Sequence, residues 1–322
     1  MRSPNSPASP ASPASSLDEW DLHEIRVDFR NAAYAQNIDR LREILDAHSS
    51  RDILRRCDLG LALLAGIGRG NLPIIELLLD HGVPIDISAN IIASGDDVPN
   101  RLETLKLFLQ HGWDTNSTAT RDGEMTMNFM MSGPDAEEVI VWFFANGANA
   151  NGIRSDIRAP IRAAASRAHN LAIPQLLLSH GATLKHTGAL HGATARPGGD
   201  ELALEMMALL LDHGCDINEW EYEGKGPYSI PQYDLGRDQG TALHMAARKG
   251  FVDRARMLVA KGVDIGKRSE KGYTAKDWAQ INGWEDVKEY LEAVMRERGM
   301  MVQDIQLEEW QRGECFSPGD MP

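Results

Sequence analysis

A segment that ends in glycine recurs along this chain at nearly constant spacing. It is a run of apolar residues, often three leucines, followed by two further residues and Gly, as in Pro73–Gly82. The terminal glycines are Gly82, Gly112, Gly147, Gly181, Gly214 and Gly262, and a weaker copy ends at His48. The steps between these ends are 34, 30, 35, 34, 33 and 48 residues. A period near 33 residues predicts a row of repeated supersecondary units instead of one compact core.

Each copy is predicted to be a helix that stops at its glycine. Apolar residues fill most positions of the run, which indicates burial on most sides, and glycine readily takes the left-handed conformation of a helix C-cap. A His or Lys precedes most of these glycines and places a donor near the last carbonyls of the helix. A second helix, rich in small residues and clearest at Thr241–Ala247, is predicted about ten residues upstream. The unit is therefore a helix-turn-helix.

Composition agrees with a repeat array. A chain of 322 residues is long for a single core, and only 43% of its residues are hydrophobic and 6% aromatic. The formal net charge of -14 argues against nucleic acid or an anionic membrane as a partner, because phosphate binding needs an excess of Lys and Arg. There is no apolar leader and no run of 18 apolar residues.

The cysteines point to a reducing compartment. Cys57, Cys215 and Cys315 are odd in number and far apart, which excludes a disulfide framework and a four-cysteine zinc site. Together with the missing leader, they lead us to expect a soluble intracellular protein, cytoplasmic or nuclear.

The units resemble the ankyrin repeat family, whose pattern is G-x-T-P-L-H-x-A-A-x-x-G followed by an apolar helix and a GADVN-type end. The best match has Gly240, Thr241, Leu243, His244, Ala246, Ala247, Gly250, Leu258 and Gly262 at pattern positions, and the next unit matches up to Gly283. Repeat ends of this type appear as GVPID, GWDTN, GANAN and GCDIN. The resemblance implies an all-α solenoid of about eight helix-turn-helix repeats over residues 29–295, in which His191 and His244 make structural hydrogen bonds in the turns.

Several units depart from this pattern. The third repeat carries an Asp96–Pro99 interruption, and the fourth has methionines between Met125 and Met131 where the family has small residues. Pro174 lies early in the second helix of the fifth repeat, and the sixth has a Pro197–Glu201 insertion between its helices. We expect a shifted or splayed helix pair at these places.

The ends of the chain are expected to lie outside the repeats. Residues 1–16 contain four Ser-Pro steps and nothing to bury, which predicts a disordered tail. Residues 17–28, with Trp20, Leu22 and Ile25, are predicted to form a short helix that caps the first repeat. Residues 296–322 are expected to form either a capping helix, with Met301, Ile305 and Trp310 facing inward, or a free docking peptide.

The longest insertion, residues 219–238, is the candidate binding site. It lies in a hairpin between repeats and contains four aromatic residues of the types enriched at binding hot spots, Trp220, Tyr222, Tyr228 and Tyr233. Two interpretations stay open: a recognition loop, or a loop whose aromatic side chains fold back onto neighbouring repeats.

Motifs for catalysis or metal binding are weak. His180, His186 and His191 are the nearest histidines in sequence, but helices packed about 8–10 Å apart do not place once-per-repeat histidines around one zinc ion. Gly66–Gly70 lacks the preceding strand and the Lys-Ser/Thr of a phosphate loop. We therefore predict no catalytic residue, no cofactor, no metal site and no enzyme activity.

The resemblance implies binding as the function. We expect an adaptor or scaffold that binds a protein partner with a basic surface through the concave face and the hairpin loops. The alternative is a regulatory or substrate-receptor subunit of a larger enzyme complex, such as a ubiquitin ligase, and a cryptic enzyme is the least favoured interpretation.

Overall fold

The computed structural model describes residues 19–48, 54–121, 123–152, 158–222 and 238–305. Over these ranges it contains 15 α-helices, one 3-10 helix and no strand, with a single isolated β-bridge between Thr118 and Met125. None of the helices in these ranges has the length and apolar character needed to cross a membrane. The predicted all-α class is therefore confirmed.

Contacts divide the chain into two compact units. The first unit, Met1–Ala93 with Val98–Gly112, contains α1 (Glu19–Tyr34), α2 (Ile38–His48), α3 (Arg56–Gly68), α4 (Leu72–Asp80), α5 (Ile87–Ala93) and α6 (Arg101–Gln110). The second unit, Ser94–Asp97 with Trp113–Pro322, contains η1 (Thr126–Met130), α7 (Ala136–Ala145), α8 (Pro160–Arg167), α9 (Ala172–Ser179), α10 (Ala189–Ala195), α11 (Asp200–Asp212), α12 (Ala242–Lys249), α13 (Val252–Ala260), α14 (Ala275–Ile281) and α15 (Glu285–Glu297).

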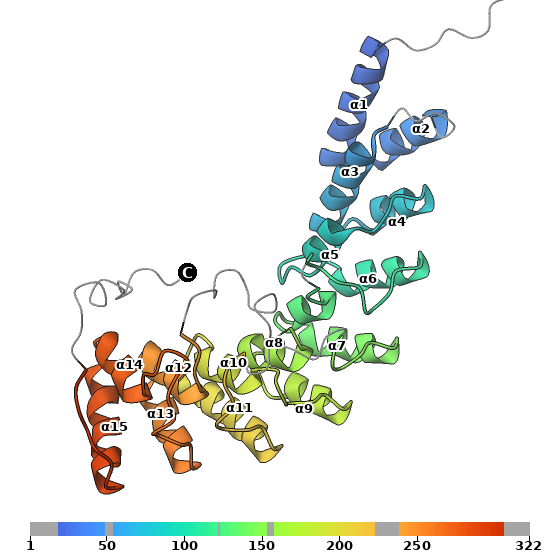
Figure 1. The fold of residues 1–322 in the computed structure, drawn as a ribbon. Coiled ribbons are helices and arrows are strands. Elements are labelled where there is room, and N and C mark those ends of the chain that lie inside the picture. The colour runs from blue at the N-terminus through green and yellow to red at the C-terminus, as the bar shows by residue number, and fades with distance from the viewer. Residues whose placement is uncertain (1–18, 49–53, 122, 153–157, 223–237, 306–322) are drawn as a thin grey trace, which may run out of the picture. The chain divides into compact units, whose positions relative to one another are not determined.

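Within each unit the helices alternate between two rows (Figure 1). In the first unit, α1, α3 and α5 contact one another in one row, and α2, α4 and α6 form the other. In the second unit, α8, α10, α12 and α14 form one row, and α11, α13 and α15 pack beside them. Counting η1 with α7, the helices make eight pairs, which confirms an ankyrin-type helical repeat solenoid of about eight units.

The repeated glycines end their helices as predicted. All six, from Gly82 to Gly262, have φ between 75° and 90°, the left-handed region that a side chain resists. Where His precedes the glycine, its Nδ1 lies 2.7–2.9 Å from the carbonyl oxygen four residues earlier, as for His81 and Leu77. An Nδ1–H donor there satisfies a carbonyl that the end of the helix would leave unpaired.

Asparagines at the ends of the GWDTN and GANAN segments link successive helix pairs. The side-chain amide of Asn116 donates to the carbonyl of Gly147 at 3.2 Å, and its Oδ1 accepts from the backbone N–H of Asn149 at 2.9 Å. Asn151 makes the equivalent bonds one pair further along, at 3.0 and 2.7 Å. These bonds fix the spacing between neighbouring hairpins in the second unit.

Two buried arginines hold the ends of helices in the preceding pair. Arg196 donates from its two terminal nitrogens to the carbonyls of Ala165 and Ala168 at the end of α8, at 3.1 and 2.7 Å. Arg254, on α13, donates from Nη1 to the carbonyls of Thr194 and Arg196 at the end of α10, at 2.7 and 2.8 Å. Each guanidinium thus serves as the C-cap of a helix in another repeat.

The Pro197–Glu201 insertion is ordered by the same Arg254. Its Nε donates to Asp200 Oδ1 at 2.7 Å, its Nη2 to the carbonyl of Gly198 at 3.3 Å, and its guanidinium stacks 3.9 Å from the centre of the Phe251 ring. The side chain of Arg254 has no exposed surface. The insertion is therefore packed against the solenoid.

Two of the predicted departures from the repeat pattern, at the methionine-rich segment and at Pro174, can be described in the structure. The methionine-rich segment forms the short 3-10 helix η1 in place of a full first helix, and its Met127 and Met130 side chains are completely buried. Pro174 lies in the first turn of α9, where its missing N–H has no intrahelical partner to lose.

The segment predicted as a short N-terminal cap is part of a longer helix. Residues from Glu19 onward are the first turns of α1, which continues to Tyr34, so the predicted boundary at residue 28 falls inside a helix. This helix packs on α2 and α3 through Phe29, Ala32 and Ala33, while Trp20 is 68% exposed. Its N-terminal end has no neighbouring helix among the described residues that would bury Trp20. Residues 1–16 lie outside the described residues.

The predicted C-terminal segment, residues 296–322, is described only as far as residue 305. The helix α15 ends at Glu297, and residues 301–305 have no helical structure. The side chain of Met301 is 83% exposed, whereas Ile305 is only partly buried. Trp310 lies outside the described residues.

Candidate partner-binding site

The 219–238 insertion enters and leaves the solenoid between α11 and α12. The backbone N–H of Glu221 donates to the carbonyl of Gly240 at 3.0 Å and so joins its two ends. Tyr222 is buried, and Trp220 is partly buried with Lys267 Nζ 5.9 Å from the centre of its ring. These two aromatic side chains are therefore at least partly withdrawn from solvent. Tyr228 and Tyr233 fall in residues 223–237, outside the described residues.

Carboxylates anchor the start of the insertion. Glu219 Oε1 accepts from the backbone N–H of His186 at 2.5 Å and lies 2.8 Å from its ring Nδ1. Glu221 Oε1 accepts from Nη2 of Arg162 at 2.6 Å. Burial alone would raise the pKa of Glu221, but Arg162 and His191 outweigh it and bring that pKa below its usual range. These carboxylates stabilise the fold and are not free to pair with a basic partner.

Asp238 anchors the other end in the same way. Its carboxylate accepts from Ser269 Oγ, from the backbone N–H of Lys271 at 2.7 Å and from Trp278 Nε1 at 2.9 Å. A small hollow lies between the two anchored ends, lined by His191, Glu221, Asp238, Gly240, Thr241, His244, Met245, Arg248 and Trp278. The ends of the insertion are thus fixed by hydrogen bonds on both sides.

Hairpin lengths explain why the insertion packs here. In the hairpin before α14, which has the regular length, fifteen residues separate Gly262 from Asp277. The hairpin before α10 is shorter, with ten residues from Gly181 to His191. The hairpin before α12 is longer, with thirty residues from Gly214 to His244. The anchor Glu219 binds the short hairpin directly, at His186. The long hairpin therefore supplies contacts that the short one is too short to make.

Gly188 makes room for the Arg162 anchor. It has φ of 64°, and a Cβ on it would lie 2.1 Å from Arg162 Nη1, which instead donates to the Gly188 carbonyl at 3.2 Å. Gly188 also stands where the repeat before α12 has Thr241. The guanidinium of Arg162 therefore occupies space that a Thr side chain takes in the regular repeat.

The turn histidines bind the next repeat, as the resemblance implied. His244 Nδ1 accepts from the backbone N–H of Thr241 at 3.1 Å, so its Nε2 carries the proton and donates to the carbonyl of Tyr273 at 3.1 Å. His191 Nε2 likewise lies 3.0 Å from the carbonyl of Gly240. Gly188 has no hydroxyl to take the place of Thr241 Oγ1, which lies 2.9 Å from His244 Nδ1, and Nδ1 of His191 has no hydrogen-bond partner among the described residues.

Acid is expected to destabilise the second unit through His191. Burial lowers its pKa to about 4, against an unfolded value of about 6.5, so its contribution to stability is complete above pH 6.5 and is lost as the pH falls toward 4. Between pH 7 and 4.5 the loss amounts to roughly 2–3 kcal/mol. Urea unfolding at the two pH values measures it.

His191→Gln is the matched control, since its amide keeps a donor near Gly240 but does not titrate. The variant should lose less stability than the wild-type protein over the same pH interval. Equal losses in both proteins would contradict the assignment of this titration to His191.

The three neighbouring histidines have separate structural contacts. His180 stacks on Phe144 with ring centres 4.0 Å apart, His186 pairs with Glu219, and His191 is buried against Gly240. Among the residues with described positions, no three His, Cys, Asp or Glu side chains come together as metal ligands.

The first unit carries exposed apolar side chains that were not predicted from the sequence. Among the described residues of the first unit, the exposed large hydrophobic side chains lie on the first helices of the pairs; they are Trp20, Tyr34, Leu61, Ile87 and Ile91. Cys57 is exposed as well, and the i, i+4 spacing of Cys57 with Leu61, and of Ile87 with Ile91, was the signal available in the sequence. Apolar residues at this spacing usually face the core, so sequence alone did not separate an exposed stripe from a buried one.

Comparison with known proteins identifies one repeat directly. Residues 238–270 match the family model of the ankyrin repeat. A segment of 55 residues is 44% identical to the Espin-like protein of Homo sapiens. That segment makes up 17% of this chain and 6% of the human protein, so the likeness spans a small part of each.

Proposed function

Because this chain is an ankyrin repeat protein, we propose that it acts as a non-enzymatic adaptor or scaffold that binds a protein partner through its first helices and its hairpins. Ankyrin repeats point to protein–protein interaction in general. The adaptor role and the position of the binding surface are the parts proposed here.

The exposed apolar side chains of the first unit are the main support. An isolated exposed Leu is ordinary, but large apolar residues collected on one row of contacting helices are typical of an interaction site. Leu61 lies on α3, and Ile87 and Ile91 lie on α5, which contacts α3. The partner is expected to bring an apolar helix face or strand to this row.

The insertion supplies a second proposed contact. Its two ends are fixed to the solenoid by Glu219, Glu221 and Asp238. Because Tyr222 is buried and Trp220 partly buried, we propose only Tyr228 and Tyr233, of the four aromatic residues in the insertion, as contacts with the partner. With a net charge of -14, the chain should bind a basic partner faster than a neutral one.

The surface is tested by introducing charge into it. Leu61→Glu and Ile91→Glu should each reduce recovery of in-cell crosslinked partners at least tenfold, because a carboxylate would have to be desolvated in the interface. Val141→Glu is the matched control, as Val141 is equally exposed but lies on α7, outside this row. Quantitative mass spectrometry of the crosslinked proteins gives the readout.

Tyr228→Ala and Tyr233→Ala test the insertion in the same assay, with an expected reduction of about tenfold each. Full recovery with the glutamate variants would overturn the first-unit surface, and full recovery with the alanine variants would overturn the insertion. Recovery of one enzyme complex in fixed ratio would favour a regulatory subunit over an adaptor.

A further inference from the structure

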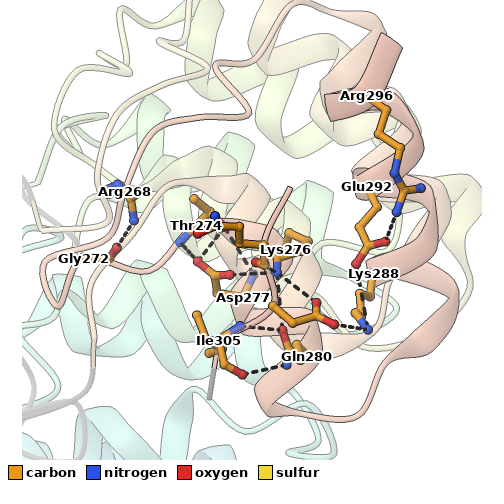
Figure 2. Close-up of polar contacts among 12 residues, drawn as sticks. Arg268, Gly272, Thr274, Lys276, Asp277, Gln280, Lys288, Glu292, Arg296 and Ile305 are labelled. Carbon is orange, nitrogen blue, oxygen red and sulfur yellow. Dashed lines mark hydrogen bonds and ion pairs between the residues drawn. The ribbon is translucent and has the colours of Figure 1, made fainter. Parts of the chain in front are cut away.

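The chain beyond α15 folds back onto α14 (Figure 2). The side-chain amide of Gln280 makes a reciprocal pair of bonds with one residue: Nε2 donates to the Ile305 carbonyl at 3.1 Å, and Oε1 accepts from the Ile305 N–H at 3.3 Å. Lys276 Nζ donates to the carbonyl of Gln303 at 2.5 Å. Two side chains of one helix thus bind the main chain of residues 303–305.

Charge adds a side-chain preference to this main-chain binding. Lys276 is 2% exposed, and its ammonium lies 3.3 Å from Asp304 Oδ1 and 3.1 Å from Asp277 Oδ1. Lys288 Nζ lies 3.6 Å from the other carboxylate oxygen of Asp304. The hydrogen bond from Lys276 and the charges of both lysines lower the pKa of Asp304. The position between residues 303 and 305 therefore favours a carboxylate.

The site corresponds to the place where a further repeat would bind. In α12, His244 donates to the carbonyl of Tyr273 in the next pair. Asp277 stands at the matching position of α14, where it accepts from the backbone N–H of Thr274 at 2.8 Å and has no proton to donate onward. In the last pair, Lys276 instead donates the hydrogen bond to the segment that follows, at the carbonyl of Gln303.

The segment that fills the site is short and weakly held. Met301 is almost fully exposed, and Asp304 is 57% exposed, so ion pairs here are screened by water. The hydrogen bonds from Lys276 and Gln280 go mainly to main-chain atoms of this segment. Another peptide whose side chains fit the site can make the same bonds. Lys276 is 2% exposed and also lies 3.1 Å from Asp277 Oδ1, so it stays part of the solenoid whether or not residues 303–305 occupy the site.

We propose that Lys276, Gln280 and Lys288 form a peptide-binding site that residues 303–305 occupy in cis, and that a partner segment that carries Asp or Glu displaces them. The occupant is a short acidic peptide. This site lies at the end of the second unit, and its test does not depend on the surface proposed for the first unit.

The test uses the full chain and a fluorescein-labelled peptide with the sequence of Gly299–Ile305, measured by fluorescence anisotropy. In the wild-type chain the cis segment competes with the peptide. Asp304→Lys places a third cation beside Lys276 and Lys288 and should release the cis segment, so this variant is expected to bind the peptide at least tenfold more tightly. Glu297→Lys, the same charge change at an exposed position of α15, should bind as the wild-type chain does.

Two further variants test recognition. A peptide with Asp304→Asn should bind the Asp304→Lys chain at least threefold more weakly, and Gln280→Ala in that chain should weaken binding at least tenfold. Circular dichroism shows whether each chain is folded. If Asp304→Lys fails to fold, Ile305→Pro takes its place, since it removes the N–H that Gln280 accepts.

Hydrogen exchange at residues 303–305 reports release of the cis segment. A folded chain that has released the segment and still fails to bind millimolar peptide would overturn the proposal and leave the segment as a fixed cap. Equal binding of the Asp and Asn peptides would overturn the preference for an acidic residue.

Discussion

Arg254→Ala is expected to lower the free energy of unfolding of the second unit by about 3–5 kcal/mol, the loss usual when one partner of a buried charged network is removed. The guanidinium of Arg254 is fully buried, and it donates to Thr194, Arg196 and Gly198 carbonyls and to Asp200. Without it, those carbonyls lose their donors in a place that water reaches poorly. Urea denaturation followed by circular dichroism measures the change.

Arg256→Ala is the matched control for Arg254→Ala. It lies two residues away on the same helix, is mostly exposed, and contacts the Tyr290 ring at 4.6 Å. We expect a loss of no more than about 1 kcal/mol, as for other exposed cation–π pairs. Similar losses for the two variants would show that the buried contacts of Arg254 contribute little.

Leu210→Ala is expected to cost about 2–5 kcal/mol, because it removes buried methyl groups and leaves a cavity in a close-packed interior. Leu210 lies on α11 and is completely buried together with Met206 and Met207. The same denaturation measurement gives the difference from the wild-type protein. The loss should appear in the transition of the second unit.

Asp212→Ala supplies the comparison for Leu210→Ala. Asp212 is exposed, and its ion pair with Lys261 at 3.2 Å is exposed as well, so the change should stay within about 0.5 kcal/mol. Comparable losses at the two positions would mean that α11 presents a different face to the core.

The architecture could be predicted because its determinants are local. Each apolar run with its terminal glycine specifies a helix and its end within ten residues, and the period specifies the stacking. Thr241 and His244 likewise lie three residues apart, so their turn is visible in the sequence. The same locality explains why the helix ends at Gly82 and Gly214 were placed correctly.

Features formed by distant residues could not be predicted. Arg254 binds residues 54 to 60 positions earlier, and the usual expectation for arginine is the surface. Trp220 and Tyr222 suit a hot spot by residue type, but their burial depends on a loop that is five residues shorter than its counterpart, more than 30 positions upstream. The face of α1 was misjudged because Trp20 has no helix to cover it among the described residues.

The short hairpin before α10 and the long hairpin before α12 depend on each other and can be exchanged only together. Since Glu219 binds His186 and Glu221 binds Arg162 beside Gly188, neither hairpin keeps its contacts when the other is replaced. Substituting a regular fifteen-residue hairpin at one site would displace the side chains that come from the other. An engineer who wishes to transplant the insertion into another repeat protein must therefore move both hairpins and Arg162 together.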